Sequence, residues 1–181
     1  MAKFMQSTYD TPKGTIMIRH AVAEDAAGLI KHVKTVEKET SFLMREVDEF
    51  NMTVELEEQF IQDKLDSEVS IFIIAEVDGE IVGSCNLSGS TRKRTRHCAE
   101  FGIAVEQKYC GLGIGRRMME TGIAWARENG VSRITLEVDT NNFNAISLYI
   151  KLGFEIEGTF RNDKKLADGT YVSGYGMALL L

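Results

Sequence analysis

Three glycines, Gly111, Gly113 and Gly115, alternate with apolar residues, and this short stretch constrains the fold more than any other part of the sequence. An apolar run over residues 98–105 precedes it, and apolar residues at helical spacing begin at Ile114. Glycine leaves the backbone bare where the first four amide groups of a helix have no partners. Because those amides and the helix dipole attract anions, the stretch predicts an anion site between a strand and a helix.

Arg116 and Arg117 follow the glycines and add positive charge, so a phosphate or pyrophosphate is the expected ligand. The alternative is a glycine turn that serves only tight packing. The P-loop pattern is absent, since no Lys-Ser or Lys-Thr pair follows the glycines, and the GxGxxG dinucleotide pattern also fails. Glu137 lies at about the distance downstream where dinucleotide-binding folds contact ribose, so a dinucleotide-dependent oxidoreductase stays open as an alternative.

Hydrophobic periodicity in the rest of the chain predicts an alternation of strands and helices. The dipeptide Asp78-Gly79 is a two-residue hairpin signal, because both residues tolerate positive φ. We expect a loose N-terminal segment over residues 1–14 and one domain of mixed α/β class over residues 15–181. The predicted strands are 15–20, 69–77, 81–87, 98–105, 133–138, 154–160 and 171–180, and the predicted helices are 24–36, 53–65, 114–129 and 145–152.

With these motifs the chain resembles the GCN5-related N-acetyltransferase (GNAT) superfamily. The coenzyme A loop of that family reads Gln/Arg-x-x-Gly-x-Gly/Ala, and residues 110–115 are similar to it, with Cys110 where the family usually has Gln or Arg. A second family pattern, Asn-x-x-Ala-x-x-Leu-Tyr-x-x-x-Gly-Phe, matches residues 142–154. The resemblance implies a twisted, mixed and mostly antiparallel sheet with helices on both faces and central strands splayed around the cofactor. Residues 158–171 look like the bacterial branch that acetylates amino acids and small amines.

The resemblance also implies acetyl-CoA as cosubstrate and assigns its parts to positions in this chain. Backbone groups of residues 103–105 would pair with the pantetheine arm as an extra strand would, and Asn142 would contact the pantetheine or the adenosine side. The pyrophosphate would lie on the turn that starts at Gly111. The cofactor-binding residues expected on this basis are Ile103, Ala104, Val105, Gly111, Leu112, Gly113, Ile114, Gly115, Arg116 and Asn142.

Tyr149 is the candidate acid, because the resemblance places it beside the thioester sulfur. Transfer of an acetyl group to an amine requires a proton donor for the leaving thiolate, and a phenol with an ordinary pKa near 10 suits that role. The spacing of Tyr149 with Ala145 and Leu148 is also that of a core residue on a helix. Both interpretations stay open at this point.

Glu100 is the candidate base that would accept the proton of the amine. Its neighbours on the same strand face, Cys98, Gly102 and Ala104, are small and leave room for a substrate. A carboxylate there would take the proton directly or through water. The alternative is a solvent-facing strand glutamate with no catalytic role.

The charge of the chain, −6 overall, disfavours a nucleic-acid partner, and the basic run 92–97 is typical of an exposed loop. Residues 37–68 hold eleven acidic and three basic side chains, a local charge of −8. An acidic rim formed by this segment would attract a cationic amine, although a solvated helix face would have the same composition. Phe42, Met44 and Phe50 would then wall the substrate pocket or anchor the loop.

The expected function is an acetyl-CoA-dependent N-acetyltransferase for the primary amine of a small molecule, such as an amino acid or a polyamine. A protein N-terminal or antibiotic acetyltransferase and a non-catalytic coenzyme A or nucleotide-binding module are the alternatives. Three cysteines without a CxxC pair and scattered histidines predict neither a disulfide framework nor a metal site. Without a signal-like segment or an apolar run of about 20 residues, we expect a cytoplasmic protein with no membrane contact. The apolar end 177–181 fits either a homodimer formed through C-terminal strands or burial in the same chain.

Overall fold

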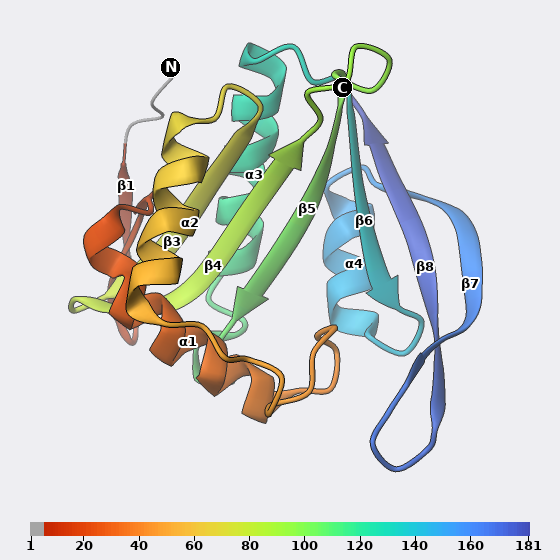
Figure 1. Ribbon diagram of the computed structural model, residues 1–181, viewed down its shortest axis with the longest axis horizontal. Coiled ribbons are helices and arrows are strands. Elements are labelled where there is room, and N and C mark those ends of the chain that lie inside the picture. Colours follow the sequence, from red (N-terminus) through yellow and green to blue (C-terminus); the bar gives the residue numbers. More distant parts are fainter. Residues whose placement is uncertain (1–5) are drawn as a thin grey trace.

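The computed structural model describes residues 6–181 as one eight-stranded sheet with helices on both faces (Figure 1). The strand order is β1-β2-β3-β4-β5-β6-β8-β7, and every neighbouring pair is antiparallel except β5 and β6. This mixed α/β fold confirms the predicted class. The strands are β1 (Ser7–Thr11), β2 (Gly14–His20), β3 (Ser70–Val77), β4 (Glu80–Gly89), β5 (Cys98–Val105), β6 (Arg133–Asp139), β7 (Glu155–Lys165) and β8 (Tyr171–Leu180). The helices are α1 (Ala26–Glu39), α2 (Val54–Asp66), α3 (Ile114–Glu128) and α4 (Phe143–Lys151), with the short 3-10 helices η1 (Ala23–Asp25) and η2 (Gln107–Tyr109).

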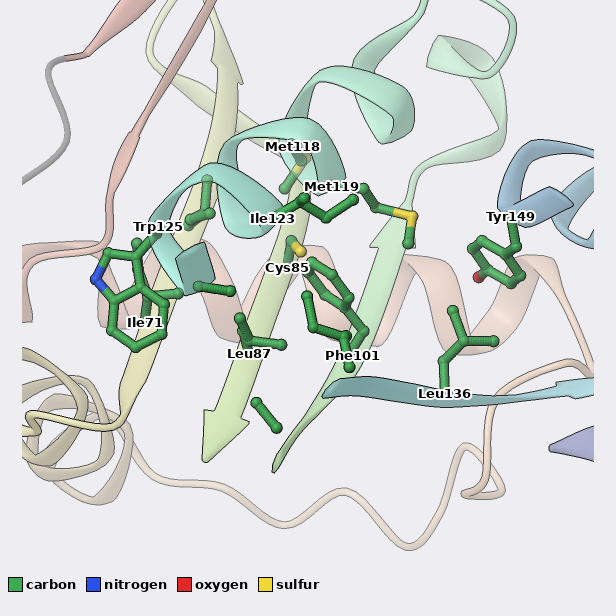
Figure 2. Close-up of a cluster of buried hydrophobic side chains, with 14 of the residues drawn as sticks. Ile71, Cys85, Leu87, Phe101, Met118, Met119, Ile123, Trp125, Leu136 and Tyr149 are labelled. Carbon is green, nitrogen blue, oxygen red and sulfur yellow. The ribbon is translucent and has the colours of Figure 1, made fainter. Parts of the chain in front are cut away.

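The two faces of the sheet bury two separate apolar clusters. Helices α1 and α2 cover one face, where Leu29 and Ile61 pack with Ile74 of β3. Helices α3 and α4 cover the other face over a larger cluster that includes Phe101, Met118 and Tyr149, part of which Figure 2 shows. Alternation along β5 therefore directs Phe101 toward α3 and leaves Glu100 on the opposite face.

The parallel pair at the centre of the sheet is short. Only residues 98–100 of β5 pair with residues 133–135 of β6, and beyond Glu100 the two strands separate, as Figure 1 shows. Strand β5 keeps its partner β4 along its whole length, from Ala99 opposite Gly89 to Val105 opposite Gly83. The predicted splay of the central strands is therefore confirmed. In the described chain, residues 101–105 have no strand partner on their β6 side.

Several local predictions are confirmed by the backbone. Asp78 and Gly79 have φ angles of 50° and 81° and join β3 to β4 as a tight hairpin. The basic run 92–97 is an exposed turn between β4 and β5. In the apolar C-terminal run, Met177, Ala178 and Leu179 are buried within the chain, whereas Leu180 is 72% exposed.

Other predictions were wrong. Residues 7–11 form β1, paired with β2, although a loose segment was expected; residues 1–5 of that segment lie outside the described part of the chain. Strand β7 extends to Lys165, beyond the predicted end at residue 160. Strand β1 and the second half of β7 were not predicted, because their residues are mostly polar and show no alternation of apolar side chains.

Candidate functional site

A cavity of about 340 Å³ opens between β5 and β6, where the two strands separate. The loop between α1 and α2, the start of α4 and the β7–β8 hairpin complete its walls, and Figure 1 shows them around the open end of the sheet. Four of the predicted catalytic and cofactor-binding residues line this one cavity: Glu100, Ile103, Asn142 and Tyr149. Phe42 and Met44, expected as possible wall residues, line it as well. The cavity is therefore the candidate active site.

Tyr149 is both a core residue and a cavity residue. Helix α4 holds it 7% exposed, with its ring centroid 6.1 Å from that of Phe154, at the edge of the apolar cluster in Figure 2. Burial, with a smaller contribution from Cys85, raises the pKa of the Tyr149 phenol to about 12. The phenol therefore keeps its proton at neutral pH and is a hydrogen-bond donor on the cavity wall.

Glu100 belongs to a negatively charged wall of the cavity. It is exposed and lines the cavity together with Glu137 of β6 and Asp163 of β7. Glu100 pairs in register with Thr135, so Glu137 follows two residues later on the same face of the sheet. Burial, followed by the charges of Asp163 and Glu100, raises the pKa of Glu137. Asp163 and Glu100 thus lie close enough to act on Glu137.

A buried ion pair borders this wall. Lys164 of β7 places Nζ 2.6 Å from Oδ1 of Asp139 at the end of β6, and both side chains are almost fully buried. The same ammonium group donates a hydrogen bond of 3.3 Å to the carbonyl oxygen of Phe42 in the α1–α2 loop. Lys164 therefore joins three elements that are distant in sequence, and its charge is already neutralised.

The cavity walls differ from the expected acidic rim. Within the described residues, none of the acidic side chains of segment 37–68 lines the cavity, and that segment contributes Phe42, Leu43 and Met44 instead. Phe50 is buried under Arg45 and anchors the loop rather than lining the cavity. Sequence reasoning missed Asp139, Asp163 and Lys164, and it considered Glu137 only as a ribose contact. Strict alternation over 133–139 is the signal that places Glu137 and Asp139 on one face of β6, and the pairing of Thr135 with Glu100 makes it the face of Glu100.

The glycine turn follows η2, the short helix after β5, and leads into α3. Gly111 and Gly113 both have a φ of +81°, which side chains with a Cβ rarely adopt, and Gly113 is the N-cap of α3. Gly115 lacks a positive φ, and a Cβ there would lie 3.6 Å from Leu148 Cδ2, an ordinary contact. Two of the three glycines are therefore required by the backbone. Their amides lie at the N-terminus of the 15-residue α3, where backbone N–H groups without helical partners can bind an anion.

The side chains around the turn have separate roles. Arg116 is exposed and pairs with Glu120 at 2.8 Å, whereas Arg117 lies over the Tyr9 ring with its Cζ atom 4.0 Å from the centroid. Ile114 is 1% exposed and Leu112 packs against the main cluster, so both offer only backbone groups to a ligand. At the other side of the cavity, the Asn142 side chain caps α4 by accepting a hydrogen bond of 3.3 Å from the Ala145 amide.

No cluster of three or more His, Cys, Asp or Glu side chains suited to a metal ion occurs in the part of the chain that the structure describes. Over the same residues, no helix combines the length and the apolar character that crossing a membrane requires. The features described above that make up the candidate site are an acidic cavity, a buried phenol and a glycine turn.

The family model of the acetyltransferase (GNAT) family matches residues 35–154, well over half of the chain, including β5, the glycine turn and α4. The chain belongs to the GNAT acetyltransferase family. A solved structure, the acetyltransferase of GNAT family from Streptococcus pneumoniae, superposes with a TM-score of 0.89 at 33% identity, covering 92% of this chain and 99% of that one. The GNAT fold that the two sequence motifs implied is thus confirmed.

Curated relatives within the GNAT family differ in their substrates. The chain is 39% identical over 110 residues to an L-amino acid N-acetyltransferase of Escherichia coli, covering 59% of this chain and 65% of that protein. It is 30% identical over 109 residues to a streptothricin acetyltransferase of Streptomyces lavendulae, covering 60% of this chain and 55% of that protein. The matches span less than two thirds of either relative, and membership of the family leaves the acceptor open.

Proposed function

We propose that this GNAT protein transfers the acetyl group of acetyl-CoA to the primary amine of a small, positively charged molecule. One observation carries the proposal: the Tyr149 phenol and the Glu100 carboxylate line one cavity, at the place where β5 and β6 separate beside the glycine turn. Donor and acceptor sites must meet in such a reaction, and this cavity is where they would meet.

The residues present fit acetyl-CoA. The pyrophosphate would accept hydrogen bonds from the bare amides of residues 111–115, where the positive φ of Gly111 and Gly113 exposes the backbone. The pantetheine arm would pair with the free edge of β5 at residues 103–105, between that strand and Asn142. Acetyl-CoA, when bound there, supplies the activated acetyl group.

Tyr149 and Glu100 would move the protons. With its pKa raised to about 12, the Tyr149 phenol holds a proton that it can give to the departing sulfur. Glu100, exposed to the cavity, would accept the proton of the incoming ammonium group directly or through water. The two groups therefore have complementary roles in one site.

The acidic wall supports a cationic acceptor. Glu100, Glu137 and Asp163 line the cavity, and the lysine beside them is neutralised by Asp139. A polyamine-like molecule, with a second positive charge, would gain from this wall. An amino acid would place its carboxylate near the same negative charges, so we rank basic and decarboxylated amines above neutral amino acids.

The test is thiol release from acetyl-CoA with the full chain over a panel of amino acids, diamines, polyamines, streptothricin-like antibiotics and peptides. We expect turnover with diamines or polyamines to exceed that with neutral amino acids at least tenfold in kcat/KM. Turnover confined to peptides or neutral amino acids would overturn the acceptor class. Binding of acetyl-CoA without turnover on any amine would instead indicate a binding module.

A further inference from the structure

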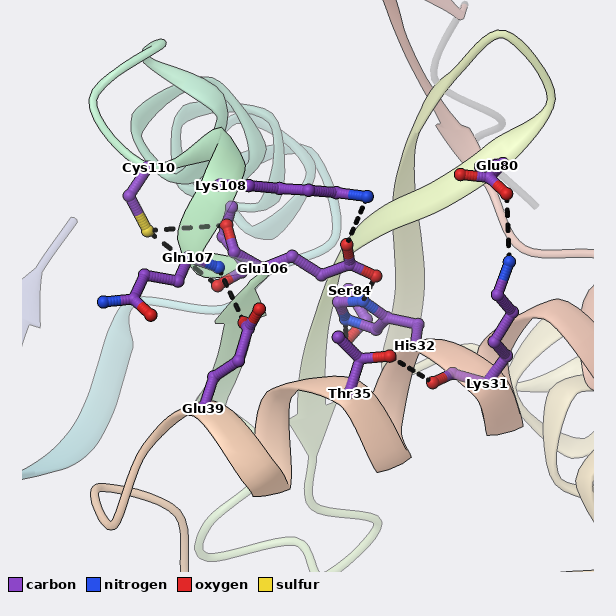
Figure 3. Close-up of polar contacts among 11 residues, drawn as sticks. Lys31, His32, Thr35, Glu39, Glu80, Ser84, Glu106, Gln107, Lys108 and Cys110 are labelled. Atoms are coloured by element: carbon purple, nitrogen blue, oxygen red, sulfur yellow. Dashed lines mark hydrogen bonds and ion pairs between the residues drawn. The ribbon is translucent and has the colours of Figure 1, made fainter.

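The end of α1 contacts the short segment that leads from β5 into the glycine turn, and Figure 3 shows these contacts. The segment runs from Glu106, which follows β5, through η2 to Cys110. Two residues of α1 contact it: His32 lies against Glu106, and Glu39 against Gln107. None of these contacts takes part in the proton transfers proposed above.

The side chain of Glu39, the last residue of α1, binds the backbone of this segment. Its Oε2 accepts a hydrogen bond of 2.7 Å from the amide of Gln107, the first residue of η2. The partners are 68 residues apart in sequence, so the bond fixes η2 against α1. Cys110 continues the segment, since its amide donates to the Gln107 carbonyl at 3.1 Å. The position of Gln107 therefore affects where Gly111 begins.

His32 and Glu106 form a buried layer beneath this bond. His32 is fully buried, and its Nε2 lies 3.2 Å from Ser84 Oγ of β4, while its Nδ1 lies 3.5 Å from Oε1 of Glu106. Glu106 is 7% exposed, and its Oε2 lies 3.4 Å from Lys108 Nζ. Among the described residues Nδ1 has no hydrogen-bond partner, so its contact with the Glu106 carboxylate is electrostatic.

The backbone of Glu106 is also fixed. Its amide donates to the Val82 carbonyl of β4 at 3.0 Å, and its carbonyl accepts from the Tyr109 amide at 2.9 Å. A buried carboxylate is unfavourable without partners, so the ring of His32 and the ammonium group of Lys108 determine where Glu106 can lie. The start of the turn is thus held from α1, β4 and η2 together.

We propose that Glu39, His32 and Glu106 are positioning residues for the cofactor: they hold η2 so that the amides of Gly111 and Gly113 point toward the pyrophosphate. This inference rests on the proposed function, because it concerns the affinity of the same site for coenzyme A. Preorganised amides bind an anion without the cost of ordering the loop first. Loss of the α1 contact therefore weakens coenzyme A binding and leaves the acceptor side unchanged.

The decisive experiment measures coenzyme A binding by calorimetry, and steady-state kinetics, for Glu39→Ala, Glu39→Gln and the control Glu128→Ala. Glu128 is exposed and ends α3, as Glu39 ends α1, and it lies about 20 Å along α3 from the turn. We expect Glu39→Ala to raise the Kd of coenzyme A and the KM of acetyl-CoA about fivefold, with kcat and the acceptor KM unchanged. Glu39→Gln keeps an acceptor oxygen and should stay within about twofold of the wild type.

A second variant addresses the buried layer. His32→Gln should also raise the Kd of coenzyme A about fivefold, and the midpoint of thermal unfolding is measured in parallel to confirm that it folds. If wild type binds coenzyme A and Glu39→Ala binds it equally well, the positioning role is wrong while the proposed function stands. The positioning role is also wrong if Glu39→Ala lowers kcat and raises the acceptor KM as much as it raises the KM of acetyl-CoA, because such a result indicates general damage to the site. If wild type does not bind coenzyme A at all, the proposed function fails first.

Discussion

Lys164 and Asp139 form an ion pair of 2.6 Å that joins β7 to the end of β6 at the candidate active site. Because Lys164 also donates to the Phe42 carbonyl, the pair fixes the α1–α2 loop over the cavity. A charge pair in this position contributes to the shape of the acceptor site as well as to stability.

Replacing Lys164 by Met should therefore affect both properties. The Asp139 carboxylate would be left buried without a partner, and we expect a loss of about 2–3 kcal/mol in the free energy of unfolding, measured by urea titration. The double variant Lys164→Met with Asp139→Asn should recover part of that loss. Lys93→Met, in the exposed turn before β5, is the control. Equal stabilities for the Lys164 and Lys93 variants would show that the pair contributes nothing.

Tyr149→Phe removes the proposed acid and keeps the ring in the core. We expect kcat to fall about 100-fold, while the Kd of coenzyme A changes less than about twofold. Because burial raises the pKa of Tyr149 to about 12, the wild-type kcat should show no alkaline decline from this group below about pH 11. An unchanged kcat in the variant would exclude Tyr149 as the acid.

The glycines of the turn should differ in their tolerance of alanine. Gly113→Ala forces a Cβ into a φ of +81°, with an expected cost of about 1–2 kcal/mol and weaker coenzyme A binding. Gly115→Ala has a φ that alanine adopts and meets Leu148 only at 3.6 Å, so stability and binding should stay close to the wild type. Urea unfolding and calorimetry compare the two variants directly. A larger loss at Gly115 would contradict the backbone argument.

Glu137→Gln tests the negative wall of the cavity. Burial and the charges of Asp163 and Glu100 raise the pKa of Glu137, and removing its charge should weaken the attraction of a dication to this wall. We expect the KM of a diamine to rise about fivefold at low salt, and that of a monoamine to change less. Glu155→Gln, at an exposed position of β7, is the matched control.

His32 should make stability depend on pH. Burial lowers its pKa below the ordinary 6.5, although the charges of Glu106 and Glu39 act in the opposite direction. The unfolded chain therefore binds a proton, as the pH falls below about 6.5, that the folded chain still excludes. Unfolding free energy should fall with pH in that window by at most about 1.4 kcal/mol per unit, and His32→Gln should flatten the slope. His97→Gln, at an exposed position, controls for the loss of a histidine.

Much of the architecture could be predicted from the sequence because the buried elements carry clear patterns. Helix α3 and the Asp78-Gly79 hairpin follow from apolar spacing and from turn residues, and both are found where expected. Strand β1 could not be predicted, because residues 7–11 are mostly polar and are held mainly by backbone pairing with β2, with Tyr9 as their one apolar contact to the main cluster.

The candidate site was only partly predictable. Tyr149 and Asn142 belong to one local motif, so their places on α4 followed from the resemblance to the GNAT family. The meeting of Glu100, Glu137 and Asp163 depends on three strands and their register, which local patterns do not encode. The composition of segment 37–68 predicted an acidic rim, but composition does not encode where side chains point, and none of its acidic side chains in the described chain lines the cavity.

The separation of β5 from β6 gives the sheet an edge in its interior. Residues 101–105 of β5 have no strand partner on that side in the described chain, and unpaired strand backbone is a template on which other extended chains can add. A pantetheine arm bound along this edge would cover the unpaired backbone groups and so block the addition of another strand. The protein should then aggregate more slowly during heating when coenzyme A is present, at ligand concentrations where turnover plays no part.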